Sequence, residues 1–134
     1  MDELPPWRLN WCGIDREAAG EAFRQHRADL LIAAIDTLIL ANCLYSKRII
    51  SHETLEHAEL LTLTSSKRNV HLFDAIEARI RTNPDDFLTL LDVLDSDPQL
   101  HVFAERIWNS YCVKVCLCRV YIGLLQRLDM QSLQ

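Results

Sequence analysis

Apolar residues recur every three to four positions along most of the chain between positions 15 and 127. This spacing places them on one face of an α-helix, and no convincing run alternates apolar and polar residues with the period of two that strands show. Polar or proline-containing breaks divide the pattern into six segments. The predicted helices cover positions 15–35, 37–45, 53–61, 65–81, 84–95 and 98–108.

Two of the breaks carry the same start signal, Asn83-Pro84 and Asp97-Pro98. Proline fits the first position of a helix, so we expect helices to begin at Pro84 and Pro98. Connections of two to six residues between amphipathic helices predict a compact antiparallel bundle. Beyond Trp108 the apolar pattern continues, either in the same helix or in a seventh that starts near Ser110.

The composition fits one globular domain. The chain has 134 residues, of which 49% are hydrophobic and 25% charged, with only 3 Gly and 4 Pro. A chain of this length can bury a real core, and this composition excludes disordered and collagen-like classes. The net charge of −5 disfavours sequence-independent binding to nucleic acid, which needs clustered positive charge.

Three features predict a cytoplasmic protein without a membrane span. The first residues lack the basic and apolar regions of a secretory signal. The longest apolar stretch, 30–46, is interrupted by Asp36 and is short for a span of about 20 residues. The five cysteines are odd in number and unevenly spaced, which favours reduced thiols over a secreted disulfide framework.

Four segments, in this order and spacing, resemble a caspase recruitment domain (CARD) of the death-fold superfamily. They are Phe-Arg-Gln-His-Arg at 23–27, Leu-Tyr-Ser-Lys-Arg-Ile-Ile-Ser at 44–51, Thr-Ser-Ser-Lys-Arg at 64–68 and Asn-Pro-Asp-Asp-Phe at 83–87. The resemblance covers roughly positions 17–108. The family often has glycine in the turn after its second helix, where this chain has Lys47-Arg48, and residues 109–134 have no counterpart.

The resemblance implies an all-α, six-helix antiparallel death-fold (CARD-like) bundle at 15–108. Residues 1–14 are then an N-terminal extension, and residues 109–134 are a Cys-rich apolar helical tail. It also implies a non-enzymatic module for homotypic CARD–CARD contacts, without cofactor or metal. The expected partner is a CARD-containing caspase, adaptor or sensor of apoptosis or innate immunity, or a second copy of the chain.

In such assemblies a basic surface on the first and fourth helices meets an acidic surface on the second and third. The basic candidates are Arg24, Arg27, Lys67 and Arg68, with Arg27 the strongest. The acidic candidates are Asp36, Glu53, Glu56 and Glu59, the last three at helical spacings of three. The competing interpretation is a solvated outer face of an amphipathic bundle. Arg79 and Arg81 are expected to be solvated cations at a helix C-terminus.

Three alternatives stay open. Cys112, Cys116 and Cys118 suggest a metal-binding or thiol-sensing protein, because Cys112 and Cys116 share a helix face. A structural zinc needs four ligands, however, and Cys118 lies about 200° around the helix from Cys116. Another death-fold adaptor, of the death-effector or pyrin type, is the second alternative. The third is a helical subunit whose apolar tail docks on an unrelated partner. Activator and decoy roles are not distinguished.

Overall fold

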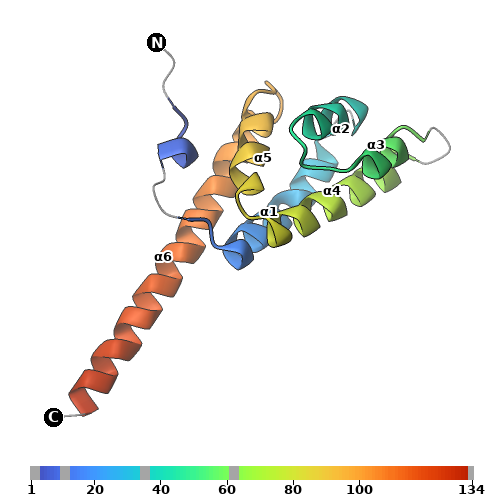
Figure 1. The fold of residues 1–134 in the computed structure, drawn as a ribbon. Helices are drawn as coiled ribbons and strands as arrows, with labels where there is room; N and C mark the ends of the chain where they lie inside the picture. The colour runs from blue at the N-terminus through green and yellow to red at the C-terminus, as the bar shows by residue number, and fades with distance from the viewer. Residues whose placement is uncertain (1–3, 10–12, 34–36, 61–63, 133–134) are drawn as a thin grey trace.

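The computed structural model describes residues 4–9, 13–33, 37–60 and 64–132 (Figure 1). Over this part of the chain the fold is all-helical, as predicted, and contains no strand. A short 3-10 helix, η1, precedes six α-helices. Their bounds are Pro6–Leu9 for η1, Arg16–Ile32 for α1, Thr37–Ser46 for α2, His52–Ala58 for α3, Ser65–Thr82 for α4, Asp86–Asp95 for α5 and His101–Ser132 for α6.

Local side chains fix where three of the helices begin. The side chains of Asp15, Ser51 and Thr64 accept hydrogen bonds from the backbone N–H three residues further on, at the starts of α1, α3 and α4. These are ordinary N-caps, which satisfy amide groups that a helix leaves unpaired. The expected starts at Pro84 and Pro98 are wrong by two and three residues, because each proline lies in a tight turn before α5 or α6.

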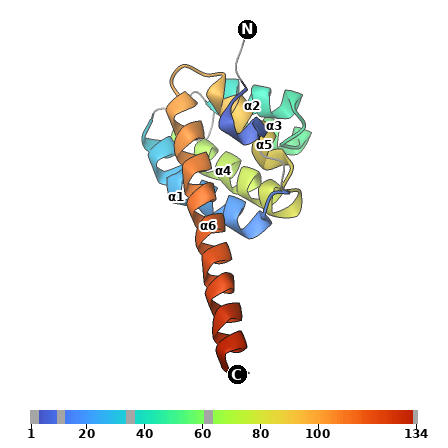
Figure 2. The ribbon, with the colours of Figure 1, turned by 90° about the vertical axis from the view of Figure 1, so that its left-hand side faces the viewer.

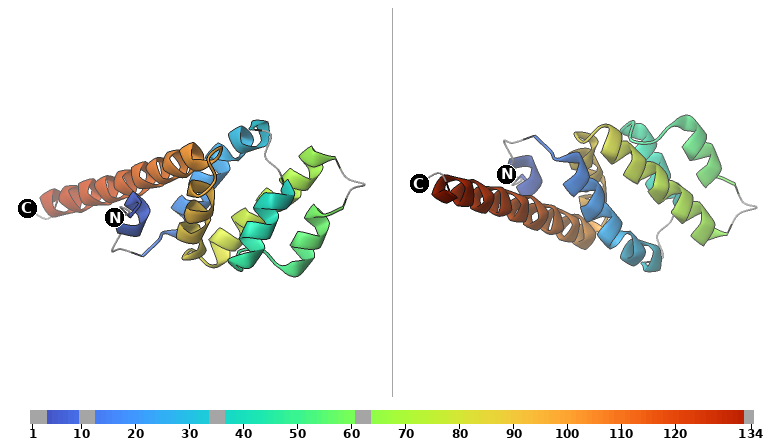
Figure 3. Two further views of the ribbon diagram at one scale, coloured as in Figure 1. Left: turned by 90° about the horizontal axis from the view of Figure 1, so that it is seen from above. Right: turned by 90° about the horizontal axis from the view of Figure 1, so that it is seen from below.

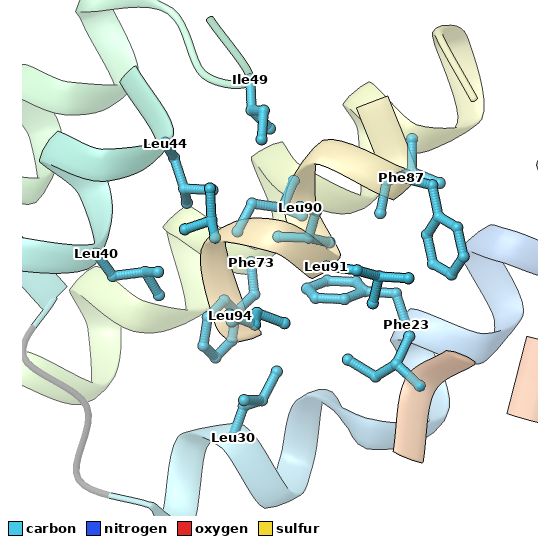
Figure 4. Packing of buried hydrophobic residues seen from close by; sticks show 14 of the residues in the cluster. Phe23, Leu30, Leu40, Leu44, Ile49, Phe73, Phe87, Leu90, Leu91 and Leu94 are labelled. Atoms are coloured by element: carbon cyan, nitrogen blue, oxygen red, sulfur yellow. The ribbon is translucent and has the colours of Figure 1, made fainter. Parts of the chain in front are cut away.

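The core takes buried residues from all six α-helices. In Figure 4, Phe23 and Leu30 of α1 lie near Phe73 of α4, and leucines of α2 and α5 pack around them. The rings of Phe23 and Phe73 pack edge to face with centroids 6.1 Å apart. Helix α1 packs against both α4 and α6, while α5 packs against α6 (Figures 1 and 3).

Part of the predicted N-terminal extension is packed into this fold. Trp7 of η1 is only 1% exposed, and its indole Nε1 donates a hydrogen bond to Asp92 Oδ1 of α5 at 2.7 Å. Arg8 forms an ion pair with the same carboxylate. Residues before position 15 therefore contribute to the core rather than only preceding it.

The turn between α2 and α3 contains an unusual backbone conformation. Arg48 has φ = 62°, in the left-handed region that favours glycine. Its N–H donates to Tyr45 O, and the N–H of Ile49 donates to Leu44 O, which is the bond pattern of a Schellman C-cap. Ile49 and Leu44 are both buried. The position at which glycine would be favoured is therefore occupied by an arginine.

Helix α6 continues past position 108 without a break, so the chain forms one long helix instead of starting a seventh near Ser110. Its first turns belong to the core. Tyr111 is 5% exposed, lies 5.3 Å from Phe87 between ring centroids, and accepts a hydrogen bond from the Asp15 N–H. The C-terminal part extends away from the other helices (Figure 2). The domain boundary at 108 stays a prediction.

Among the helices that the structure describes, none combines the length and the apolarity needed to cross a membrane.

A histidine connects α1 to the same part of α6. His26 Nε2 lies 2.7 Å from Ser110 Oγ. Burial lowers the pKa of His26 below its ordinary 6.5; Asp29 opposes this decrease, whereas Arg106 and Lys114 add to it. The folded state therefore favours the neutral imidazole, and protonation of His26 favours unfolding.

The stability that His26 contributes is complete above its ordinary pKa of 6.5 and is lost as the pH falls through the lower folded-state value. We expect His26→Gln to lose less stability than the wild type when the pH falls from about 7.5 to about 5.5. Urea unfolding across this range measures the difference. His101→Gln, which removes an exposed histidine, is the control. Equal pH slopes for wild type and His26→Gln would contradict this role.

Candidate interaction surface

The structure brings Arg24 and Arg27 together on α1, but it pairs both with α4. Arg24 Nη2 lies 2.6 Å from Glu77 Oε2. Arg27 Nη2 lies 2.6 Å from Asp74 Oδ1, and its Nη1 lies 3.4 Å from Glu77 Oε1. Because Arg24 pairs with Glu77 and Arg27 with Asp74, the two helices run antiparallel along this seam.

Arg81 extends the seam toward the start of α1. Its guanidinium lies 3.0 Å from Glu17, 3.2 Å from Glu21 and 3.7 Å from Glu77. The expectation that Arg81 is a solvated cation is therefore wrong: its side chain is 25% exposed and crosses α1 above Gly20. A Cβ at Gly20 would lie 2.7 Å from the guanidinium carbon, so a larger residue there would displace the Arg81 side chain from this position.

Glu77 is the centre of the seam, with 7% of its surface exposed. Burial raises the pKa of Glu77, but the hydrogen bond from Arg24 and the charges of Arg24, Arg27 and Arg81 outweigh burial and lower it below 4.5. The carboxylate is thus held ionised against three guanidinium groups. The sequence offers one signal for this arrangement, the spacing of four residues between Glu77 and Arg81 on α4.

The seam is consequently not a simple basic surface. Arg24, Arg27 and Arg81 face the carboxylates of Glu17, Glu21, Asp74 and Glu77. The sequence predicts that Arg24 and Arg27 contact a partner, but much of their positive charge is balanced by carboxylates of the same chain. Arg24 keeps 58% of its side chain exposed, whereas Arg27 keeps only 19%. A contact of either residue with a partner stays a prediction.

The other two basic candidates lie at the opposite end of α4. Lys67 is exposed and lies seven residues before Asp74, which is almost two helical turns, or about 10 Å, on the same face. Arg68 Nη1 donates a hydrogen bond to Ala58 O at 3.3 Å, which ties the start of α4 to the end of α3. Lys67 is therefore exposed and, within the described residues, forms no ion pair, unlike Arg24 and Arg27.

The acidic candidates on and after α3 are open to solvent. Glu53, Glu56 and Glu59 are all exposed. Glu56 lies 3.2 Å from His52 Nδ1, and within the described chain neither Glu53 nor Glu59 forms an ion pair. We call these three residues the acidic stripe. The fourth candidate, Asp36, lies outside the described residues.

An uncharged surface borders the acidic stripe. Helix α2 contains no charged residue and packs on α3, where the Tyr45 ring lies 5.8 Å from that of His52. Ile39 is 59% exposed and Tyr45 is 41% exposed on α2. An apolar centre bordered by a polar rim is the common arrangement in protein–protein interfaces.

Among the described residues, the thiols of Cys112 and Cys116 form no disulfide. Cys112 and Cys116 are exposed and free, and the side chain of Cys118 lies outside what the structure describes. Over the described residues, no three histidine, cysteine or acidic side chains are close enough to hold a metal together. Partial desolvation raises the pKa of the Cys112 thiol, which disfavours the reactive thiolate at neutral pH.

Comparison of the chain with protein-family models, curated proteins and solved structures gives no significant match.

Proposed function

We propose that the chain is a non-enzymatic interaction module of the CARD type. It recruits a CARD-containing signalling protein of apoptosis or innate immunity, or a second copy of itself, through opposed acidic and basic surfaces. The resemblance of the four sequence segments and the order of six helices support this function. A death-effector or pyrin-type adaptor would use its surfaces in the same way.

The observation that carries the proposal is the accessibility of the acidic stripe. Glu53, Glu56 and Glu59 keep their carboxylates in solvent beside an uncharged α2, while most other acidic groups near α1 and α4 are paired inside the chain. Exposed charge of one sign steers the encounter with a partner of opposite sign and fixes the register of the contact.

Fewer basic residues are available for the contact than the sequence implies. Lys67 supplies a solvent-exposed charge at the start of α4, and the exposed part of Arg24 lies further along the seam. Arg27 and Arg68 hold the helices of the chain together. A contact between the acidic stripe of one molecule and Lys67 of the next uses two different surfaces, so it repeats head to tail.

Reversal of charge in the acidic stripe tests this function. We expect the wild type to show a concentration-dependent increase in light scattering and the double variant Glu56→Arg/Glu59→Arg to lack it, because like charges then face Lys67. Both side chains are exposed, so the variant is expected to stay folded, with a far-ultraviolet circular dichroism spectrum like that of the wild type.

Glu105→Arg, which makes the same reversal at an exposed position on α6, is the matched control and is expected to assemble normally. Assembly that survives in the double variant would show that the acidic stripe is not the contact. A wild type that stays monomeric at every concentration would exclude self-assembly and would leave recruitment of another protein.

A second candidate function is favoured by the shape of α6. Its C-terminal part extends away from the bundle (Figures 1 and 2), and its sequence is rich in Val, Ile and Leu. Docking of this segment on a partner would survive the reversal of the acidic stripe. Loss of association on truncation after Cys116, with the stripe intact, would favour this candidate.

A further inference from the structure

An open pocket of about 460 Å³ lies on another part of the molecule, between the turn that joins α2 to α3 and the C-terminal half of α4. Positions 48–51 and Thr54 form one side, and Ala75, Ala78, Arg79 and Thr82 form the other. Its size falls within the range of small-molecule sites. No carboxylate lines it, although the chain as a whole carries a net charge of −5.

The polar groups of the pocket are mainly donors. Arg48 is exposed and has no ion pair within the described part of the chain. Arg79 uses its Nε to bind Asp86 Oδ2, and neither of its terminal nitrogens forms an ion pair with a described acidic residue. Asp86 thus orients the guanidinium while leaving its four terminal N–H groups available.

The hydroxyl groups add one further donor. Ser51 Oγ and Thr54 Oγ1 lie 3.1 Å apart, so one of them donates to the other and one hydroxyl proton remains. Thr82 Oγ1 donates to Ala78 O at 2.8 Å and has no proton left. Two guanidinium groups and a hydroxyl around one opening match the several acceptor oxygens of a phosphate better than a single carboxylate.

The turn places Arg48 at the mouth of the pocket. Its φ of 62° is the left-handed position of the Schellman cap that ends α2, and this conformation costs an L-residue free energy that glycine would avoid. The pocket thus has an arginine at a position where glycine would be more stable.

We propose that this pocket binds a phosphate group, with Arg48 and Arg79 as its cationic contacts and the Ser51–Thr54 hydroxyl pair as a further donor. The apolar lining from Ala75 and Ala78 contacts the carbon portion of a phosphate monoester. The site does not involve the acidic stripe, so it stands or falls separately from the proposed function.

Titration followed by ¹⁵N–¹H NMR tests the site, at constant ionic strength and at a concentration at which the chain is monomeric. Inorganic phosphate and O-phosphoserine are the two probes, and sodium chloride is the blank. We expect saturable shifts at positions 48–54 and 75–82 in the millimolar range. Saturation by both probes indicates a monoester site, and saturation by inorganic phosphate alone indicates a site for the free ion. Shifts that do not saturate, or that appear equally with chloride, would overturn the proposal.

Arg48→Gly separates binding from stability. It removes the charge and relieves the backbone, so phosphate affinity is expected to fall about tenfold while the melting temperature rises. Lys47→Gln removes the same charge one residue away, outside the pocket, and is expected to keep the wild-type affinity. Equal affinities for wild type and Arg48→Gly, or an equal loss in Lys47→Gln, would overturn the assignment of Arg48.

Discussion

Glu77→Ala is expected to lower the free energy of unfolding by about 2–3 kcal/mol, because it leaves three guanidinium groups facing one another without their shared carboxylate. The value lies below that for a fully buried pair, since Arg24 in particular is half exposed and screened by solvent. Urea unfolding measures the loss. Glu21→Ala removes an exposed carboxylate of the same seam and is expected to cost less than about 1 kcal/mol.

The same carboxylate predicts acid sensitivity. The folded state lowers the pKa of Glu77 below 4.5, so its contribution is complete above that value and is lost as the pH falls through the folded-state pKa. Glu77→Gln is therefore expected to flatten the dependence of stability on pH below about 4.5. Equal losses for the Glu77 and Glu21 variants, with no change in the pH profile, would contradict the central role of Glu77.

Truncation after Trp108 is expected to destabilise the chain by about 3–5 kcal/mol, the usual cost of removing a large buried side chain. It deletes Tyr111, which packs on Phe87 and binds the Asp15 N–H, together with the hydroxyl of Ser110 that contacts His26. Thermal unfolding followed by circular dichroism measures the effect.

Truncation after Cys116 is the matched control, because it retains Tyr111 and removes only the part of α6 that extends away from the bundle (Figure 2). We expect its stability to stay within about 1 kcal/mol of the full chain. If both truncations cost the same, the first turns beyond position 108 are not part of the core.

The helices were predictable because their signals are local. Asp15 and Ser51 cap the helices that follow them, and α2 spans almost the residues that its apolar run predicts. The helix starts near Pro84 and Pro98 were misplaced because proline also fits the tight turn that precedes a helix. The proline at each break was compatible with a helix that begins at the proline and with one that begins a few residues after it.

The seam was not predictable because it depends on how α1 aligns with α4. The spacing of Arg24 and Arg27 predicts that they lie on the polar face of a helix. Such a face is equally compatible with contact to solvent, to a partner or to a neighbouring helix. Only the antiparallel packing shows that Glu77 and Asp74 lie opposite them. The same limit applies to Trp7, whose partner Asp92 is 85 residues away in the sequence.

The alignment of α1 with α4 also determines which basic residue can be substituted to test assembly without disturbing the fold. Reversal of charge at Arg27 would place a third carboxylate beside Asp74 and Glu77, so a loss of assembly could come from a damaged fold. Lys67 is exposed and lies two turns away from Asp74 on the same face of α4. Lys67→Glu therefore tests the contact without disturbing the seam.

The most direct test of the proposed head-to-tail contact mixes two complementary variants, Glu56→Lys/Glu59→Lys and Lys67→Glu, and measures their mass by light scattering. Each variant alone carries like charges on both contact surfaces and is expected to stay monomeric. In the mixture the reversed stripe of one variant faces the reversed position 67 of the other, and the two unchanged surfaces also attract each other. The mixture is therefore expected to recover head-to-tail assembly with alternating variants, which weakens with salt. A mixture that stays monomeric while the wild type assembles would contradict the contact between the acidic stripe and Lys67.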